Sequence, residues 1–480
     1  MGPGDVEVLR AVHDSRHVRP GDLFVAVPGT KVDGHQFIQM ALDSGASAIM
    51  AEHALTLPAA VPLLVVRGAR EALALAAHVL AGSPTERLTV CGITGTSGKT
   101  TTAFLVRSIL EQAGWPTGLL GTVAYVIGRR EIPSDMTTPD ANDLAGYFAQ
   151  MVEAGLKAAV MEVSSHALDQ RRTAGIRFSV AAFTNLSPEH RDYHLTMDDY
   201  RAAKGRLFEM LDPQAAAVLN ADDPVSAYYK QVTHARVLWY GLKGGVDVTA
   251  EDVRLSLSGT RFMLVTPRGR AEARTALLGL HNVQNCLAAA AVGEALGLPL
   301  EKIVAGIAAL PMVRGRLEAV PGDRPFTVLV DYAHKTDALE HCLGTVHDLV
   351  HGHGRLIAVF GCGGNRDRKK RPDMAKVAER LADRVIVTSD NPRNEEPQAI
   401  AAEIVAGFSS MQKVTVELDR RAAIALAISE ARPGDAVVIA GKGHETYQQI
   451  GDVKRPFDDR EVAAEILRSS PGRLALPGRG

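Results

Sequence analysis

The residues best suited to chemistry lie in one glycine-rich segment of the 480-residue sequence. Apolar and β-branched side chains over residues 88–93 predict a buried strand, and the apolar spacing typical of a helix begins at Thr100. Between them, Gly95 and Gly98 permit a tight turn whose N–H groups face inward. Such a turn before a helix holds polyphosphate, because Lys99 reaches the outer phosphates and the Thr100 hydroxyl can ligate Mg²⁺. The segment predicts nucleotide binding; a glycine-rich turn beside a surface lysine is the alternative.

Two further groups of polar residues belong to the same stretch of chain. Glu162 ends an apolar strand and could hold Mg²⁺ directly or through water, while a solvated helix cap with Ser164 as N-cap is the alternative. Residues 189–194 contain two histidines and two carboxylates, which can ligate a metal or transfer protons. Lys204 lies on a predicted amphipathic helix, where a lysine is ordinarily solvated, so its spacing alone assigns it no role.

The C-terminal third of the chain repeats the pattern of polar residues after apolar strands. Asp331 follows one such strand and can bond a ribose hydroxyl. Loops over residues 361–368 and 390–393 carry arginines, and a loop over 441–445 carries a carboxylate. Arginine holds a carboxylate bidentately and a carboxylate accepts from ammonium, so these loops could recognise a zwitterion. Three histidines over residues 347–353 could bind a metal, but the dipole at a helix C-terminus is the simpler explanation for them.

Composition narrows the class of protein. Hydrophobic residues make up 46% and charged residues 22%, and the formal net charge is −2, so no global field recruits nucleic acid or an anionic membrane. The four cysteines form no C-x-x-C pair, which indicates reduced thiols rather than disulfides or a zinc site. Neither a signal peptide nor a run of 18 apolar residues is present. We therefore expect a soluble, cytoplasmic protein without a membrane partner.

The alternation of strands and helices predicts an α/β fold with three domains. We expect a small N-terminal α/β domain over residues 1–84, a central domain over 85–316 and a compact α/β domain over 317–480. The expected strands are, in chain order, 22–27, 48–50, 63–66, 88–93, 158–163, 180–184, 215–219, 327–330, 356–360, 384–388, 414–417 and 436–440. Helices are expected over 37–44, 141–153 and 282–296, with a hairpin over 253–265 that turns at Ser258-Gly259.

Taken together, these residues resemble the Mur ligase superfamily of ATP-dependent amide ligases in peptidoglycan precursor synthesis, and within it the MurE type. The resemblance runs from about Asp14 to about Arg460. Residues 95–100 are similar to the family's G-T-x-G-K-T form, which accounts for Ile93 at the position of the first glycine in the strict phosphate-loop pattern. The resemblance implies a UDP-sugar-binding N-terminal domain, a central P-loop domain that binds ATP, and a Rossmann-like C-terminal domain that binds an amino acid.

The resemblance also implies a role for individual residues. ATP contacts are implied for Gly95, Thr96, Ser97, Gly98, Lys99, Thr100, Thr101, Asn282, Arg316 and Asp331. Contacts to a UDP-muramoyl dipeptide are implied for His13, Ser15, Thr30, Lys31, Val32, Thr137, Thr138, Ser164, Gln170 and Arg172. Magnesium ligation is implied for Thr100, Glu162, His190 and a carbamate on Lys204, and the catalytic group for Lys99, Lys204, His190 and Glu162. Two positions depart from the family pattern, Met136 and the pair Lys335-Thr336.

Substrate choice follows from the loop Asp390-Asn391-Pro392-Arg393, whose form resembles the one associated with meso-diaminopimelate. The arginine suits the extra carboxylate that distinguishes diaminopimelate from lysine. The implied diaminopimelate contacts are Arg366, Asp390, Asn391, Pro392, Arg393, Gly441 and Glu445.

The resemblance thus implies an ADP-forming ligase, with Mg²⁺ as cofactor and ATP as co-substrate. It would add meso-diaminopimelate to UDP-N-acetylmuramoyl-L-alanyl-D-glutamate through an acyl phosphate. We expect a monomer that acts on small molecules. A lysine-adding ligase of the same type, a P-loop phosphotransferase or NTPase, a non-catalytic nucleotide-binding protein and the folylpolyglutamate synthase branch are the alternatives. The loop at Asp390 and the N-terminal motif Asp14-Ser15-Arg16 speak against the last of these.

Overall fold

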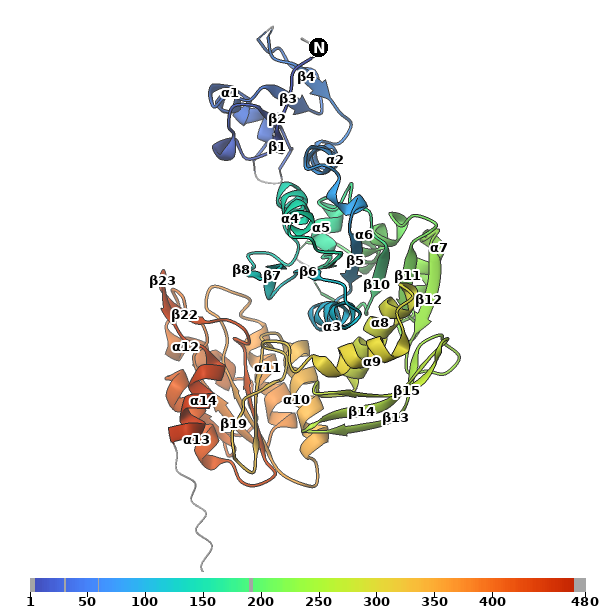
Figure 1. Ribbon diagram of the computed structural model, residues 1–480. Helices are drawn as coiled ribbons and strands as arrows, with labels where there is room; N and C mark the ends of the chain where they lie inside the picture. The colour runs from blue at the N-terminus through green and yellow to red at the C-terminus, as the bar shows by residue number, and fades with distance from the viewer. Residues whose placement is uncertain (1–4, 30–31, 59, 190–192, 470–480) are drawn as a thin grey trace, which may run out of the picture. The chain divides into compact units, whose positions relative to one another are not determined.

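The structure is a computed structural model that describes residues 5–29, 32–58, 60–189 and 193–469. Helices and strands alternate along the chain (Figure 1), and its internal contacts group it into two units. The first consists of Met1–Glu251, Met263–Ala273 and Gln284–Ala309, and the second of Asp252–Phe262, Arg274–Val283 and Leu310–Gly480. Both are α/β, as the alternation of elements in the sequence predicts. Across the described part of the chain, no helix has the length and apolar character needed to cross a membrane.

The first unit begins with a four-stranded parallel sheet in the order β1-β2-β3-β4. Its strands are β1 (Arg10–Val12), β2 (Asp22–Val25), β3 (Ala48–Ala51) and β4 (Leu63–Val65), which confirms the three predicted strands. The helices are α1 (Ile38–Asp43) and α2 (Ala69–Leu80). Strands β2 and β3 are buried along their whole length, because parallel strands covered on both faces are apolar throughout.

An eight-stranded sheet in the order β12-β11-β10-β5-β9-β6-β7-β8 forms the rest of the first unit's core. Its strands are β5 (Thr89–Thr94), β6 (Thr117–Leu120), β7 (Ala124–Ile127), β8 (Arg130–Pro133), β9 (Ala158–Glu162), β10 (Val180–Phe183), β11 (Ala216–Asn220) and β12 (Arg236–Tyr240). Strands β12 through β6 are parallel, and β7 and β8 are antiparallel additions. Since β5 pairs with β10 and β9, the segments that follow these three strands emerge at one edge of the sheet.

The helices of this unit are α3 (Lys99–Gln112), α4 (Ala141–Glu153), α5 (Ser165–Asp169), α6 (Met197–Glu209), α7 (Ser226–Val232) and α9 (Leu300–Ala309). Helix α8 (Leu280–Ala295) matches the predicted helix over 282–296, and α4 matches the prediction over 141–153.

Strands β13 (Thr249–Ser256), β14 (Gly259–Thr266) and β15 (Gly269–Thr275) form a separate sheet. The predicted turn at Ser258-Gly259 lies between β13 and β14, where Gly259 has a φ of +126°.

The second unit contains a six-stranded sheet in the order β16-β17-β21-β18-β19-β20, parallel except for β16 (Glu318–Ala319). Its other strands, all predicted, are β17 (Thr327–Asp331), β18 (Leu356–Phe360), β19 (Arg384–Val387), β20 (Val414–Val416) and β21 (Ala436–Ala440). Helices α10 (Thr336–Val350), α11 (Lys370–Leu381), α12 (Pro397–Val405), α13 (Arg420–Glu430) and α14 (Asp459–Ser469) pack on its two faces. The hairpin β22 (Tyr447–Ile450) and β23 (Val453–Pro456) was not predicted, because its strands are short and polar.

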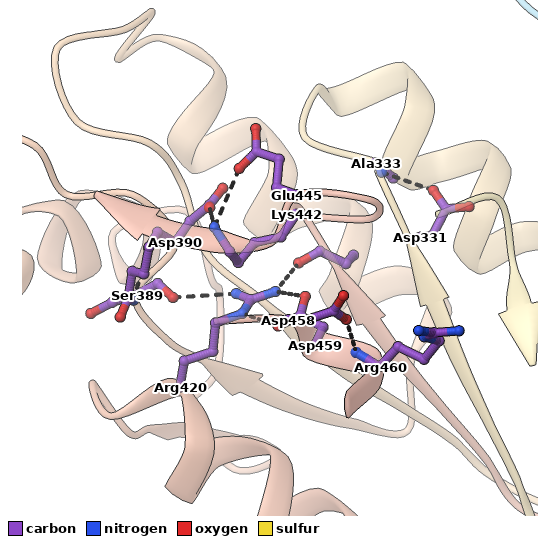
Figure 2. A network of polar contacts seen from close by, with 12 residues as sticks. Asp331, Ala333, Ser389, Asp390, Arg420, Lys442, Glu445, Asp458, Asp459 and Arg460 are labelled. Atoms are coloured by element: carbon purple, nitrogen blue, oxygen red, sulfur yellow. Dashed lines mark hydrogen bonds and ion pairs between the residues drawn. The ribbon is translucent and has the colours of Figure 1, made fainter. Parts of the chain in front are cut away.

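A fully buried ion pair joins two helices to the ends of two strands in this unit (Figure 2). Arg420, the first residue of α13, donates to both carboxylate oxygens of Asp459, the first residue of α14, at 2.7 and 2.6 Å. The same guanidinium donates to the carbonyl of Ala440 at 3.0 Å and to that of Ser389 at 3.2 Å. One side chain therefore fixes the points at which β19 and β21 turn into their loops.

We predict that Arg420→Met lowers the free energy of unfolding by about 3–5 kcal/mol, because it leaves the Asp459 carboxylate buried without its cation. Urea unfolding monitored by circular dichroism measures this loss. The matched control is Arg421→Met, which removes the neighbouring arginine from an exposed pair with Glu465 and should leave the midpoint unchanged. Equal midpoints for the two variants would contradict the role of the Arg420–Asp459 pair.

Candidate functional site

The segment between β5 and α3 forms the predicted glycine turn at the helix N-terminus. Gly98 is the N-cap of α3 with a φ of +84°, and Gly95 has a φ of +148°, conformations that side-chain-bearing residues rarely adopt. The Lys99 ammonium donates to the carbonyls of Gly95 and Thr96, at 2.8 Å each. Thr100 and Thr101 are buried in the first turn of the helix. The backbone therefore has the shape that holds phosphate at a helix N-terminus.

The loop after β10 fixes the shape of this turn. The backbone N–H of Thr96 donates to the carbonyl of Asn185 at 2.8 Å, and the N–H of Ser97 donates to the Asn185 side-chain oxygen at 2.9 Å. The Thr184 hydroxyl donates to the carbonyl of Ser97 at 2.6 Å. The strand predicted from the sequence ends at Thr184, and the sequence assigns no role to Thr184 or Asn185. Their role depends on the pairing of β10 with β5, which only the structure shows.

Glu162, the last residue of β9, lies beside the first turn of α3. It is buried, and its Oε2 accepts from the Thr100 hydroxyl at 3.0 Å. Thr122, just after β6, donates its backbone N–H to Oε1 at 2.8 Å and its hydroxyl to Oε2 at 3.1 Å. The carboxylate is buried at the phosphate loop rather than solvated, although Ser164 does cap α5, where its hydroxyl accepts from the Ala167 N–H at 3.2 Å. Thr122 was not predicted, because β6 itself was not recognised in the sequence.

Lys204 is fully buried on α6, so the expectation of a solvated lysine is wrong. Its ammonium donates to the carbonyl of Gly95 at 2.9 Å and lies 4.5 Å from the centre of the Tyr200 ring. Burial, and then the nearby charge of Lys99, hold the pKa of Lys204 well below its usual value. Two lysines therefore donate to the same carbonyl at the phosphate loop, and the buried one has a lowered pKa.

The residues implied in dipeptide contacts gather beyond Glu162. The Thr138 hydroxyl donates to the Glu162 carbonyl at 2.9 Å and accepts from the backbone N–H of Ser164 at 3.0 Å. Arg172 donates to the Thr138 carbonyl at 3.1 Å and to the Gln170 side-chain oxygen at 2.6 Å. The Thr137 hydroxyl lies 3.1 Å from that of Thr122. Met136, the position that departs from the family pattern, contributes its sulfur as an acceptor for Arg172 at 3.4 Å.

The predicted metal set is only partly described, since His190 lies outside the described residues. The neighbouring His194 is buried, and its Nε2 lies 3.0 Å from the Ser165 hydroxyl. Burial lowers the pKa of His194, which favours the neutral ring. Within the ranges that the structure describes, no group of three His, Cys, Asp or Glu side chains is arranged around a metal position. The described histidines over residues 347–353 belong to no such group either. The Nδ1 of His347 lies 2.9 Å from the Leu381 carbonyl.

Of the predicted UDP contacts that the structure describes, His13 and Ser15 lie between β1 and β2, and Val32 lies between β2 and β3. Thr30 and Lys31 lie outside the described residues, and Val32 beside them is exposed. Ser15 is buried, and its hydroxyl donates to the Met40 sulfur at 3.3 Å. The Nδ1 of His13 is buried without a hydrogen-bond partner among the described atoms, which leaves it available to a ligand.

The second unit holds the other residues implied in nucleotide contacts. Asp331, the last residue of β17, accepts backbone N–H groups of Leu317 at 2.7 Å and Ala333 at 2.8 Å, and burial raises its pKa (Figure 2). Arg316 lies over the Tyr332 ring, 5.6 Å from its centre. Asn282 is buried and donates to the carbonyl of Leu278 at 2.8 Å.

The three loops predicted to bind a zwitterion come together beyond β18, β19 and β21. Arg393 adopts a left-handed φ of +52° and donates to the carbonyl of Gly364 at 2.8 Å. Asn391 donates its side-chain N–H to Oε2 of Glu445 at 2.8 Å. The described loops also place Asp390, Pro392 and Gly441 at this end of the sheet, with Arg366 exposed. Lys442, which sequence reasoning left without a role, is fully buried among them.

Three family models match the chain. The Mur ligase family catalytic domain matches residues 11–79, the Mur ligase middle domain residues 93–293, and the Mur ligase glutamate ligase domain residues 315–443. A UDP-N-acetylmuramoyl-L-alanyl-D-glutamate--2,6-diaminopimelate ligase of Bacillus velezensis is 46% identical over 96% of this chain and 95% of its own length. The ligase of the same name from Geobacter metallireducens is 46% identical over 97% and 94%.

Solved structures give the same picture of the fold. A structure of UDP-N-acetylmuramoyl-L-alanyl-D-glutamate--2,6-diaminopimelate ligase superimposes with a TM-score of 0.74 and 33% identity, covering 96% of this chain and 95% of that chain. The MurF ligase of Thermotoga maritima in complex with ADP gives a TM-score of 0.60 at 21% identity, covering 97% of both chains. At this lower identity the likeness concerns the fold alone.

We predict that Gly95→Ala weakens ATP binding by at least about tenfold, which corresponds to a loss of about 1.4 kcal/mol in binding free energy. An added Cβ would lie 1.9 Å from the Thr184 hydroxyl oxygen, so the turn must move. Isothermal titration with ATP and Mg²⁺ measures the change. The control is Gly114→Ala, after the same helix, where φ is also positive but no atom lies within 4 Å. Unchanged affinity in Gly95→Ala would contradict the fixed geometry of the loop.

Proposed function

The chain belongs to the Mur ligase family, and on that premise we propose that it joins 2,6-diaminopimelate to UDP-N-acetylmuramoyl-L-alanyl-D-glutamate in an ADP-forming reaction of peptidoglycan precursor synthesis. One observation carries the proposal. The phosphate loop has two lysines on the Gly95 carbonyl and a buried carboxylate on Thr100. This arrangement suits phosphoryl transfer from ATP to a carboxylate substrate.

The reaction has two steps. A carboxylate oxygen of the substrate's glutamate, the γ-carboxylate in the MurE type, attacks the γ-phosphorus of ATP, and the bond to ADP breaks. An uncharged amine of diaminopimelate then attacks the carbonyl carbon of the acyl phosphate. The tetrahedral intermediate loses one N–H proton and releases phosphate, which takes up that proton, and an amide remains. Lys99, at the start of α3, neutralises charge on the phosphoryl oxygens while the phosphoryl group passes from ATP to the substrate carboxylate.

The residues beside the phosphate loop fit a magnesium ion. Mg²⁺ prefers oxygen ligands, and the Thr100 hydroxyl and Glu162 carboxylate are 3.0 Å apart in a buried position. His190 and Lys204 complete the proposed set. When bound, Mg²⁺ would neutralise negative charge on the phosphoryl oxygens. Thr122, which donates twice to Glu162, orients that carboxylate toward the loop.

Lys204 is proposed to act as a carbamate. A carbamate forms when an uncharged amine adds to CO₂, and the buried Lys204 has a lowered pKa, which raises the uncharged fraction. The modification would replace a cation with an anion at the Gly95 carbonyl, so the side chain would turn away from that acceptor. The oxygens of the carbamate are then suited to a second Mg²⁺.

The amino-acid substrate is assigned to the loops of the second unit. Arg366 and Arg393 are proposed to bind the distal carboxylate of diaminopimelate. Glu445 is proposed to accept from the ammonium group of diaminopimelate that does not react. Arg393 is anchored through one N–H to Gly364, which leaves its other donors for a ligand. We also propose three domains over 1–84, 85–316 and 317–480, a monomeric state, and action in the cytoplasm on small molecules alone.

We predict that the protein, offered UDP-N-acetylmuramoyl-L-alanyl-D-glutamate, ATP and Mg²⁺, ligates meso-diaminopimelate in preference to equimolar L-lysine. Mass spectrometry distinguishes the two products. In Arg393→Ala the preference should fall by about 30-fold or more, because a charge-assisted pair is worth at least 2 kcal/mol. A lysine product from the wild type would discard the assignment of this loop. Phosphate release without an amide product would discard the ligase itself.

We predict that Lys99→Ala abolishes ligation while the protein stays folded. The lysine is half-buried and donates to two loop carbonyls, so its removal withdraws charge from the site without opening a cavity in the apolar core. Product formation and the melting temperature measure the two effects. Lys157→Ala, a change on the surface before β9, is the control and should retain wild-type turnover. Retained activity in Lys99→Ala would rule out the phosphate-loop mechanism.

A further inference from the structure

Lys442 is a buried cation at the end of β21 to which the proposed reaction assigns no role. Its side chain has no exposed surface, and its ammonium donates to Oδ1 of Asn391 at 3.1 Å. It also donates to Oε2 of Glu445 at 3.3 Å (Figure 2). Oδ1 of Asp390 lies 3.7 Å away. The lysine therefore lies behind the loops that carry the predicted amino-acid contacts, out of reach of a ligand.

This placement fixes the orientation of the Asn391 amide. Its oxygen accepts from Lys442 and from the backbone N–H of Gln449 at 2.8 Å. Its nitrogen is consequently left to donate to Oε2 of Glu445 at 2.8 Å. Rotation of the amide by half a turn would direct N–H groups at an ammonium and at an amide N–H, which leaves all of them unsatisfied.

The Glu445 carboxylate is oriented as a result. Its Oε2 accepts from both Lys442 and Asn391, whereas Oε1 has no hydrogen-bond partner among the residues that the structure describes. The side chain is 20% exposed, so this oxygen can be reached from solvent. A carboxylate with one oxygen held from behind and the other open is preorganised to accept from an ammonium ion.

The charges of the cluster favour the same ligand. Asp390 and Glu445 carry two negative charges and Lys442 one positive charge, and the Oδ1 of Asp390 is buried without a hydrogen bond. Arg420 lies near but is committed to Asp459. Asp390, Glu445 and Lys442 together carry a net charge of −1, which favours a cationic group beside Glu445. Arg366 and Arg393, by contrast, lie on the neighbouring loops. Without Lys442 the two carboxylates would repel each other.

We propose that Lys442 is a positioning residue for the amino-acid substrate: it fixes Asn391 and Glu445 so that Oε1 of Glu445 receives the substrate ammonium group. This inference rests on the proposed function, because it concerns the amine-bearing substrate of that reaction. It predicts that Lys442 governs the KM for diaminopimelate without touching the substrate.

The first test is Lys442→Met, which keeps the length of the side chain and removes its charge. We expect the KM for diaminopimelate to rise about tenfold or more, the effect of losing 1.4 kcal/mol of binding. The KM values for ATP and the UDP substrate should stay within about twofold, and kcat should fall less than the KM rises. A folded variant with the wild-type KM for diaminopimelate, or parallel changes for all three substrates, would overturn the proposal.

The matched control is Lys454→Met. Lys454, on β23, lies 4.3 Å from the centre of the Tyr447 ring, and Lys442 lies 5.5 Å from the same ring. Lys454 is exposed, and its ring contact resembles that of Lys442 without the bonds to Asn391 and Glu445. All three KM values should be unchanged in this variant. Equal effects of the two substitutions would show that only general charge near the ring matters, and would overturn the proposal.

A double variant tests the route of the effect. If Lys442 acts through Glu445, then Lys442→Met in a Glu445→Gln background should raise the KM for diaminopimelate much less than in the wild type. Multiplicative effects would overturn the proposal. If Lys442→Met does not fold, a crystal structure of the wild type with diaminopimelate decides. The ammonium must then lie on Oε1 of Glu445 with Lys442 on Oε2; Lys442 on the substrate itself would contradict the assignment.

These outcomes are distinct from failure of the proposed function. A wild-type protein that does not ligate diaminopimelate refutes the function and removes the basis of the inference. A wild-type protein that does ligate it, with an unaltered KM in folded Lys442→Met, refutes the inference alone.

Discussion

The carbonyl oxygen of Gly95 accepts hydrogen bonds from two lysine ammonium groups, at 2.8 Å from Lys99 and 2.9 Å from Lys204. Two like charges at one oxygen repel each other, and burial together with this repulsion lowers the pKa of Lys204. Such an arrangement is relieved when an anion enters the loop or when one amine loses its charge. The glycine turn, the loop after β10 and the burial of α6 all serve to hold these groups in place, so the site is built around positive charge that a polyphosphate would neutralise.

In the second unit, buried cations again hold loops in place, but here those loops carry negatively charged carboxylates. Its strand-end loops carry carboxylates, and two fully buried cations hold these loops in place. Arg420 donates to the carbonyls of Ser389 and Ala440. Lys442 donates to the side chains of Asn391 and Glu445. A buried cation is tolerated only when it is paired and hydrogen-bonded. Each therefore fixes its partners firmly, and firm partners are what recognition of a charged substrate needs. In both units the functional groups lie where parallel strands end.

The sequence predicts most of the strands because buried parallel strands are continuous apolar runs, as in residues 356–360 and 436–440. Short strands such as β6 escape this signal, and with β6 the contact of Thr122 to Glu162 is missed. Lys204 escapes for another reason. On its own helix it resembles any solvated lysine, and its burial depends on a carbonyl 109 residues away in sequence. Only the family resemblance marked it, because periodicity carries no long-range information.

The backbone conformation of Arg393 is fixed before any substrate binds, which bears on the proposed selectivity for diaminopimelate. An arginine in the left-handed region is strained, and such strain persists only where the surrounding structure over-determines it. Here the Arg393 N–H donates to the Gln449 carbonyl at 3.1 Å, its carbonyl accepts from Gly451 at 2.8 Å, and its guanidinium donates to Gly364. The hairpin β22–β23 thus holds the residue from which the guanidinium projects. If Arg393 binds the extra carboxylate of diaminopimelate as proposed, that carboxylate meets a donor that the fold has already ordered, which would favour diaminopimelate over lysine.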